Sequence, residues 1–235
     1  MKFAKQISTW VYALAELISP RRCVVCGDLL EDYEEGLCLA CNINLPRTHY
    51  HLLADNPLHN LLVNRFPLVR ATAYMFYRPG SLHAQLVRKL KYRGRSDLGV
   101  LLGRYAATEI GPSGFFEGVD VILPVPLHVR KLRKRGYNQS LMLAQGLSAI
   151  TGLPISQGVA RTRWTDSQTH KSYSARQEIL KGVFSLVRPD ELHGKHVLVV
   201  DDVITTGATI TACSRAACEA GDVRVSVFCL ADAMG

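Results

Sequence analysis

Along most of this 235-residue chain, short apolar stretches alternate with stretches whose apolar residues are spaced as on one face of a helix. The apolar or alternating stretches predict strands at residues 71–77, 119–125, 159–163, 196–200 and 223–230. Stretches with apolar side chains three or four positions apart predict helices at residues 81–91, 96–110, 138–150 and 209–220. Strands that alternate with helices are typical of a parallel sheet covered on both faces. The pattern therefore predicts an α/β domain over residues 69–235.

The first twenty residues show a different pattern. Helical spacing of Ile7, Trp10, Val11, Leu14 and Ile18 predicts an amphipathic helix over residues 1–20. This helix is expected to pack on its own protein, and a helix that binds a partner or a membrane surface is the alternative. The apolar run within it is too short for a secretion signal or a membrane span, so we predict a cytoplasmic protein with no membrane span.

Four cysteines follow as two CxxC pairs. Cys23 and Cys26 form the first pair and Cys38 and Cys41 the second. This spacing is typical of a four-thiolate zinc site, whereas two disulfides conflict with a reducing cytoplasm and a redox motif needs only one pair. Because so short a segment cannot bury a core, we predict a structural zinc ribbon over residues 21–48 that the metal holds folded. Residues 49–68 contain prolines and no clear period, and are interpreted as a linker with a short helix.

Basic residues exceed acidic residues by 28 to 20, which gives the chain a formal net charge of +8. Two basic blocks lie at residues 88–95 and 130–135, and acidic residues gather at residues 28–35. Such blocks suit an anionic ligand, either phosphate groups or a nucleic-acid backbone. A solvated helix face explains a basic run equally well.

The strand predicted at residues 196–200 leads into the segment with the clearest chemistry. Two adjacent acids, Asp201 and Asp202, precede Val203 and a loop of small residues that opens a helix. The loop consists of Thr205, Thr206, Gly207, Ala208 and Thr209. Its N–H groups and hydroxyls can surround a phosphate, and the carboxylates can accept hydrogen bonds from ribose hydroxyls or bind hydrated Mg²⁺. An ordinary strand, turn and helix with a solvated acid pair is the alternative.

Residues 197–210 resemble the signature with which type I phosphoribosyltransferases bind phosphoribosyl pyrophosphate (PRPP). Further segments agree with one branch of that superfamily. They are residues 23–41, 90–95 (LKYRGR), 124–128 (PVPLH), 135–139 (RGYNQ) and 182–184 (GVF), with Gln168 and Arg176. Together they resemble the ComF/GntX family, the competence protein F group of bacteria, over nearly the whole chain from about residue 23.

The resemblance implies a type I phosphoribosyltransferase fold with five parallel strands, with PRPP as the ligand and Mg²⁺ bound with it. It implies that Asp201 and Asp202 are the catalytic carboxylates that hold the ribose hydroxyls, and that residues 205–209 bind the 5′-phosphate. The loop of Pro124, Val125 and Pro126 corresponds to the pyrophosphate side, and residues 164–171 correspond to a flexible loop that closes over the site. By charge and location, the candidates to offset the diphosphate are Arg93, Arg130, Arg135 and Lys171.

One departure from the family pattern is Ile179, where we expect an asparagine, and this weakens the expectation that the loop closes in the usual way. We predict a PRPP-binding, phosphoribosyltransferase-like protein that transfers or releases a phosphoribosyl group and handles incoming DNA. Its expected partners are PRPP, single-stranded DNA, and DNA-uptake or helicase proteins. The alternative is a non-catalytic, PRPP-responsive protein that binds single-stranded nucleic acid, although only Tyr92 and Tyr137 interleave with the basic blocks.

Overall fold

The computed structural model describes residues 20–92, 94–163 and 182–234. The chain divides into two compact units, Met1–Leu45 and Pro46–Gly235. Among the described helices, none has both the length and the apolar character that crossing a membrane requires.

The described part of the first unit, residues 20–45, has little regular structure. It contains one short helix, α2 (Leu39–Ile43), and an isolated antiparallel bridge between Arg22 and Leu29. Its buried apolar side chains are those of Cys23, Val24, Val25, Leu37, Cys41 and Leu45. A core of this size is far below what an independently folded segment needs.

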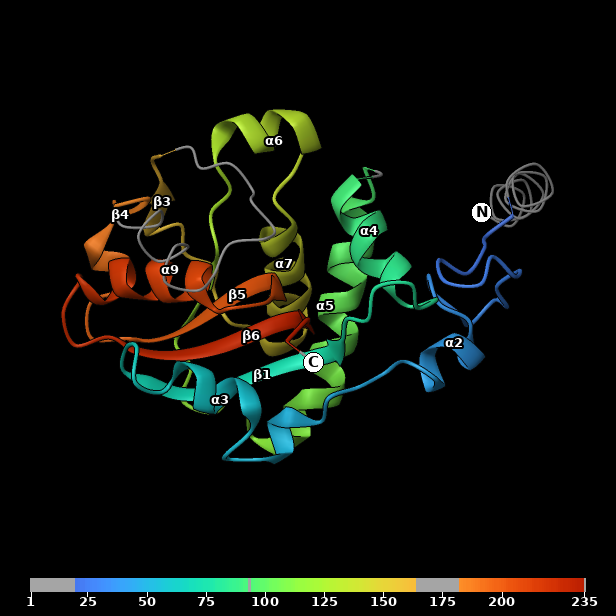
Figure 1. Cartoon of the computed structure of the whole chain (residues 1–235), viewed down its shortest axis with the longest axis horizontal. Coiled ribbons are helices and arrows are strands. Elements are labelled where there is room, and N and C mark those ends of the chain that lie inside the picture. Colours follow the sequence, from blue (N-terminus) through green and yellow to red (C-terminus); the bar gives the residue numbers. More distant parts are fainter. Residues whose placement is uncertain (1–19, 93, 164–181, 235) are drawn as a thin grey trace, which may run out of the picture. The chain divides into compact units, whose positions relative to one another are not determined.

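Four parallel strands form the main sheet of the second unit (Figure 1). Their order is β1 (Leu68–Phe76), β6 (Arg224–Asp232), β5 (His196–Ile204) and β2 (Val121–Pro124). The resemblance implied five parallel strands, and beyond β2 the described residues add only a single parallel bridge between Ile122 and Ile155. The sheet confirms the α/β class and the parallel arrangement.

Residues 159–163 were expected to contribute a strand to the parallel sheet, and this was wrong in one respect. The strand exists as β3 (Val159–Arg161), but it pairs antiparallel with β4 (Phe184–Leu186) in a separate two-stranded sheet. A run of three residues carries no indication of which strand it will pair with, so the local pattern could not reveal this.

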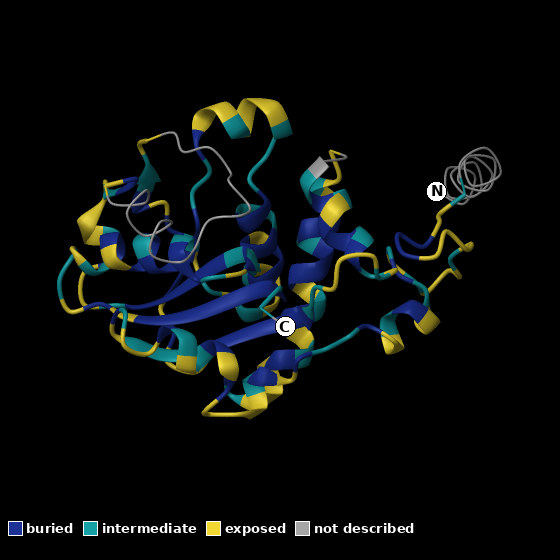
Figure 2. Ribbon diagram, in the orientation of Figure 1, coloured by how far each residue is buried: buried dark blue, intermediate teal, exposed yellow. Residues whose placement is uncertain are grey.

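Helices cover both faces of the main sheet, so the strands are buried between exposed outer surfaces (Figure 2). On one face, Val197 and Val199 pack with α3 (Pro57–Leu62) and α9 (Ala208–Cys218) in one apolar cluster. On the other face, α7 (Gln139–Thr151) contacts β5 and β2. Alternate strand residues point to opposite faces, which explains why β5 reads as a continuous apolar run.

Helix α7 is held in place by close packing against α5 (Ser96–Ile110). Two glycines make this approach possible, because a Cβ on Gly146 would lie 2.1 Å from the Val100 carbonyl oxygen and one on Gly103 would lie 2.3 Å from the Leu143 carbonyl oxygen. No side chain fits at such distances. The helix pair therefore fixes where α7 begins, at the carboxyl edge of the sheet.

The remaining elements connect this framework. They are η1 (Tyr50–Leu52), α4 (Ala84–Tyr92), η2 (Gly111–Ser113), α6 (Val129–Arg135) and η3 (Pro189–Glu191). Helix α6 contains the second basic block, and it ends where Gly136 takes a left-handed φ of 84°. Its Arg133 and Lys134 side chains are exposed, as a solvated helix face would require.

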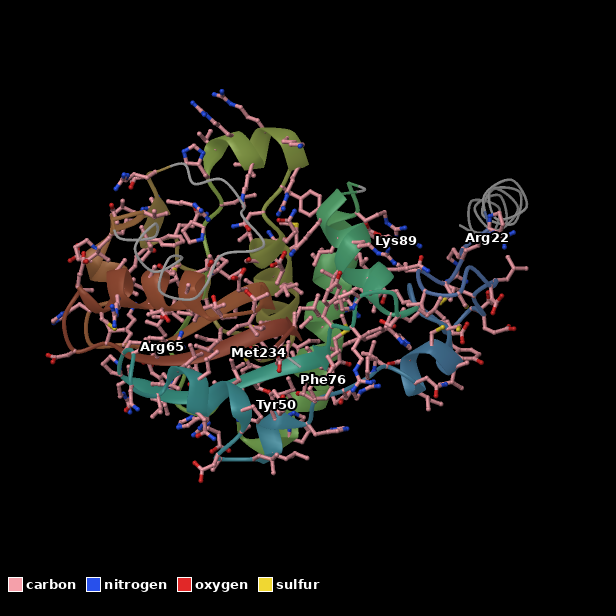
Figure 3. All side chains as sticks on the ribbon, in the orientation of Figure 1. Arg22, Tyr50, Arg65, Phe76, Lys89 and Met234 are labelled. Atoms are coloured by element: carbon pink, nitrogen blue, oxygen red, sulfur yellow. The ribbon has the colours of Figure 1, made fainter. Side chains whose placement is uncertain are left out.

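The segment interpreted as a linker, residues 49–68, is part of the second unit. Leu58 and Leu62 of α3 are fully buried, and the ring of Tyr50 meets that of Phe76 edge-on, with 5.8 Å between centroids (Figure 3). Asn56 is buried as well, and its Nδ2 donates to the Ala71 carbonyl of the edge strand β1 at 2.9 Å. Prolines suggested a linker because they interrupt the periodicity, but the apolar residues between them cover the sheet.

Candidate functional site

The acid pair, Asp201 and Asp202, lies at the carboxyl end of β5, where the loops after the parallel strands meet. The strand was expected to end at Val200, but it continues through both acids to Ile204 and stays paired with β6. Because successive side chains of a strand point to opposite faces, the two carboxylates diverge and meet different neighbours.

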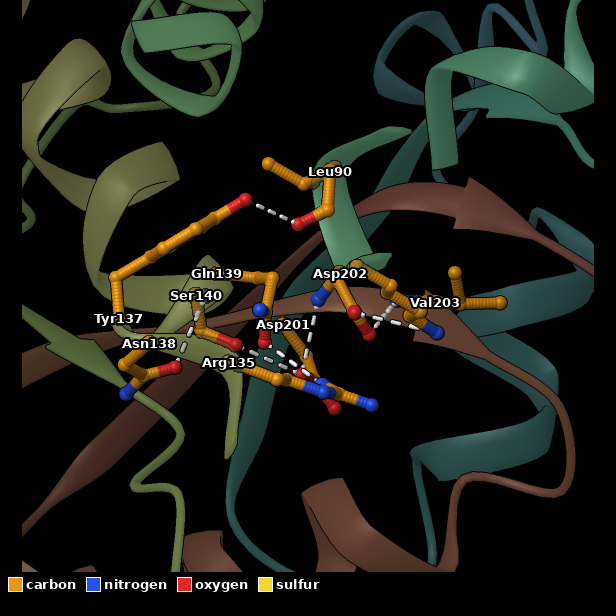
Figure 4. Close-up of polar contacts among 10 residues, drawn as sticks. Leu90, Arg135, Tyr137, Asn138, Gln139, Ser140, Asp201, Asp202 and Val203 are labelled. Atoms are coloured by element: carbon orange, nitrogen blue, oxygen red, sulfur yellow. Dashed lines mark hydrogen bonds and ion pairs between the residues drawn. The ribbon is translucent and has the colours of Figure 1, made fainter. Parts of the chain in front are cut away.

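The first turn of α7 orients Asp201 (Figure 4). Ser140 Oγ donates a hydrogen bond of 2.9 Å to Asp201 Oδ1, and the same oxygen accepts the Asp202 N–H at 2.9 Å. Burial, and after it the charge of Asp202, raises the pKa of Asp201 to about 7, while the two hydrogen bonds lower it. The carboxyl group is thus fixed in orientation and changes its protonation near neutral pH.

Asp202 pairs with a cation from α4. Its Oδ2 lies 3.2 Å from Lys91 Nζ, and its Oδ1 accepts the Val203 N–H at 2.7 Å. The Asp202 and Lys91 side chains are 12% and 23% exposed, so water screens the pair only in part. Sequence reasoning placed Lys91 in a basic block and gave it no role, because nothing local relates α4 to β5.

The loop predicted for the pyrophosphate side lies beside β5. Pro124 ends β2, the buried Val125 donates its N–H to a β5 carbonyl at 2.9 Å, and Pro126 follows half-buried. Asn138 caps α7 and also donates from Nδ2 to the Val125 carbonyl at 3.0 Å. One side chain therefore joins this loop to the helix that orients Asp201. Asn138 was noted as part of a family motif, without a role.

Of the arginines predicted to meet a diphosphate, Arg135 is brought to the start of α7. Its Nη1 donates to Gln139 Oε1 at 2.8 Å, one residue before the serine that binds the acid pair (Figure 4). Arg130 is exposed on α6, and Arg93 lies outside the described residues. Lys171, the predicted flexible loop at residues 164–171 and the N-terminal helix also lie outside them.

Two further cations border the acid pair, and the sequence gave no sign of either role. Burial, and then the charges of Arg161, Arg135 and Lys91, lower the pKa of Lys131 in α6, while Asp202 opposes this shift. Burial also lowers the pKa of Arg161 in β3, and the negative charge of Asp201 is the largest effect that opposes this shift. Positive side chains from three separate elements, Lys91, Lys131 and Arg161, therefore interact electrostatically with the two carboxylates, an arrangement that suits a ligand with both hydroxyl and anionic groups.

Residues 205–209 form the turn from β5 into α9. Gly207 has a left-handed φ of 72°, and among the described residues no side-chain hydrogen bond caps the helix at this position. An uncapped helix start of this kind is suited to binding an anion. Thr205 is exposed, Thr206 and Thr209 are half-buried, and Ala208 is buried. Phosphate binding by this turn stays a prediction.

Close packing explains the glycine at position 207. A Cβ there would lie 2.9 Å from Leu62 Cδ2 and 3.0 Å from Arg65 Nη1, which belong to α3 and the turn after it. Arg65 Nη1 also donates to the Thr206 carbonyl at 2.9 Å. Glycine therefore lets the turn approach α3 and adopt a positive φ.

The four cysteines of the first unit come together as their spacing predicts. Their sulfur atoms all lie within 4.8 Å of one another, and none of the four cysteines forms a disulfide. Although burial raises it, hydrogen bonds from neighbouring N–H groups lower the pKa of the Cys23 thiol to about 6. A closed set of four sulfur ligands suits a tetrahedral structural metal ion and leaves no open position for a substrate.

Curated relatives of this chain are known from several bacteria. It is 34% identical over 212 residues to the DNA utilization protein YhgH of Escherichia coli strain K12, which covers 88% of each chain. It is 38% identical over 116 residues to Competence protein F of Haemophilus influenzae, which covers 48% of this chain and 51% of that one. It is also 22% identical to Competence protein ComFC of Bacillus subtilis, over 88% of this chain and 82% of that one. No family model matches the chain.

Among solved structures, the chain is similar to glutamine PRPP amidotransferase from B. subtilis, complexed with ADP and GMP. The TM-score is 0.40 and the identity 25%, over 60% of this chain and 30% of the much longer amidotransferase chain. An allosteric regulatory enzyme of purine biosynthesis matches with a TM-score of 0.39 and 24% identity, over the same shares.

Proposed function

We propose, for a chain that belongs to the family of DNA utilization protein YhgH and competence protein F, that the acid pair and the turn after it bind PRPP. The observation that carries this proposal is the Ser140–Asp201 hydrogen bond of 2.9 Å beside a helix start without a side-chain cap. An oriented carboxylate next to an uncapped helix start suits a ribose 5-phosphate. The sugar hydroxyls can donate hydrogen bonds to the carboxylate, and the phosphate can accept them from the N–H groups of the helix start.

In this proposal each end of PRPP meets a different part of the site. Residues 205–209 bind the 5′-phosphate, with Val203 just before them, and Asp201 and Asp202 accept hydrogen bonds from the ribose hydroxyls. The diphosphate lies toward the loop of residues 124–126 and the cations Arg135, Lys131 and Lys91. Arg161 borders the same space from β3.

The chemistry that fits this placement is transfer or release of the phosphoribosyl group. The bond from C1 of the ribose to the diphosphate oxygen breaks, the diphosphate leaves with the electron pair, and a nitrogen nucleophile or water forms the new bond to C1. The cations hold the leaving diphosphate while the acid pair holds the sugar, so electrostatic positioning carries the reaction. Carboxylate oxygens are hard ligands that fit Mg²⁺, which would supply further charge to the diphosphate when bound.

The first test is calorimetric titration of the zinc-loaded protein with PRPP and Mg²⁺. We expect the double variant Asp201→Asn/Asp202→Asn to lose binding by at least about tenfold, because amides neither accept as strongly from hydroxyls nor carry charge. Asp190→Asn is the matched control, since Asp190 is exposed in η3. Wild-type protein that binds no PRPP would remove the proposal. Pyrophosphate release with one nitrogen compound would identify the acceptor.

For the cysteine cluster we propose structural zinc. Four sulfur ligands that lie this close together are the donor set that zinc takes in closed, non-catalytic sites. Metal analysis of protein purified without added metal tests this, with one zinc per chain as the expected result. Another metal or less than half a zinc per chain would contradict it.

A second candidate function is non-catalytic binding of single-stranded nucleic acid in the cytoplasm, as part of DNA handling with uptake or helicase proteins. The observation in its favour is the exposed basic face of α6, with Arg133 and Lys134. Each phosphate contact steepens the salt dependence of binding, so Arg133→Ala/Lys134→Ala should flatten the slope of log Kd against log salt by about 1 to 2. If PRPP leaves oligonucleotide affinity unchanged, the two activities are separate.

A further inference from the structure

Gln139, the first residue of α7, has an unusual environment for a neutral amide. Its side chain is 2% exposed, and its Oε1 accepts a hydrogen bond of 2.8 Å from Arg135 Nη1. Its Nε2 is buried and has no hydrogen-bond partner among the described residues. Leaving such a buried donor unpaired disfavours the folded state. The side-chain amide therefore accepts the hydrogen bond of Arg135 through Oε1, while its own Nε2 donor stays unpaired.

A glutamate of the same shape would remove this cost. Its side chain has no N–H to leave unpaired, and it would bind Arg135 more strongly through a charged pair. An acidic side chain is also favourable in the first turn of a helix, near the positive end of the helix dipole. Glutamate would also bring a third carboxylate close to the acid pair, one residue away from Ser140, which binds Asp201. In addition, it would neutralise Arg135. The glutamine orients the guanidinium and leaves its charge intact.

We infer that Gln139 is a positioning residue that holds Arg135 ready for the diphosphate group of a phosphoribosyl ligand. The backbone supports the same conclusion, because Arg135 is the last residue of α6 and Gly136 turns the chain with a φ of 84°. The helix end thus fixes the backbone of Arg135, and the amide of Gln139 orients its guanidinium (Figure 4). This inference rests on the proposed function and adds which side chain orients the diphosphate contact.

The location of the arginine agrees with an anionic group rather than with the sugar. The charge of Arg135 is among those that lower the pKa of Lys131, so the two cations lie near each other on the α6 side of the acid pair. Two cations that repel each other in the free protein gain most from an anion with several charges. A diphosphate supplies these charges, whereas a ribose with a single 5′-phosphate leaves this side of the site empty.

The test compares PRPP with ribose 5-phosphate, which lacks the diphosphate, by calorimetry on full-length, zinc-loaded protein. The variants are Gln139→Glu, which neutralises Arg135, and Gln139→Met, which releases it and removes the unpaired N–H. We expect both to weaken PRPP binding by about tenfold or more, the effect of losing a hydrogen bond to a charged group, and to change ribose 5-phosphate binding by less than about twofold. The melting temperature should stay the same or rise in both variants.

Gln145→Glu is the matched control, because Gln145 lies on the same helix and is exposed. It makes the same change of charge and should leave both ligands unaffected. Equal loss of both ligands in the Gln139 variants would overturn the inference, because a purely structural role would disturb the whole site. Wild-type affinity for PRPP in both variants would overturn it as well and leave the proposed function standing. Wild-type protein that binds neither ligand would remove the proposed function, and the inference with it.

Discussion

Residues 20–45 bury only four apolar side chains besides two of their four cysteines, whereas the sheet unit buries the strands of a parallel sheet between helices on both faces. In the first region four sulfur atoms lie close together, as metal ligands would, and little apolar burial holds the chain. In the second region, apolar burial supplies the stability, so the protein can hold buried acids and cations at the sheet edge. The comparison teaches that the first unit has little apolar burial to hold its fold, whereas the sheet unit buries enough to keep charged side chains together at the sheet edge.

Removal of metal should separate the two regions most clearly. A strong chelator should unfold residues 20–45 and leave the sheet unit folded, because bound zinc supplies about 10–16 kcal/mol in small zinc domains. Limited proteolysis with mass spectrometry would then show cleavage within residues 20–45 while residues 182–234 stay protected. Protection of both regions after chelation would mean that the first unit has another source of stability.

Leu62→Ala should have the next largest effect, and only on the sheet unit. Leu62 is fully buried in α3, so the cavity should lower the free energy of unfolding by about 2–5 kcal/mol, measured with urea. Leu52→Ala is the control, since this leucine is 64% exposed and should cost little. If the two variants were equally stable, residues 49–68 would be the linker that the sequence suggested.

Ser140→Ala tests how the sheet unit holds its acids. The hydrogen bond of Ser140 lowers the pKa of Asp201, so its loss should raise that pKa further, from about 7, in NMR titrations of the carboxyl carbons. At a pH above this pKa, the charged Asp201 carboxylate of the variant lacks the Ser140 hydrogen bond. The free energy of unfolding should therefore fall by about 1.5–3 kcal/mol. An unchanged pKa would show that the serine does not orient the acid.

The smallest expected effect concerns His196 at the start of β5. Burial, with the charges of Arg224 and Arg70, lowers its pKa, while Gly118 and Asp120 oppose the shift. The unfolded chain therefore binds the proton more readily, so this contribution to stability is present above about pH 6.5 and is lost as the pH falls through the lower folded pKa. Urea unfolding from pH 8 to 5 should show a steeper loss in the wild type than in His196→Gln.

Much of the fold followed from local patterns. The helices around 96–110 and 138–150 and the strands around 119–125 and 223–230 lie where apolar spacing predicted them, because burial against one partner imposes that spacing. The cysteine cluster was equally predictable, since both pairs lie within nineteen residues of each other. The pairing of β3 with β4 and the packing of residues 49–68 were missed, because both depend on partners far away in sequence.

By itself, the sequence determined the α/β class, the four-sulfur cluster and the position of the acid pair before a helix start. Each of these is a local matter of residue type and spacing. The tertiary structure alone decided that Lys91 pairs with Asp202, that Ser140 orients Asp201, and that Gln139 holds Arg135. Only packing of the helices against the sheet brings these side chains together, since short-range periodicity specifies which face is buried and not which distant charge will meet it.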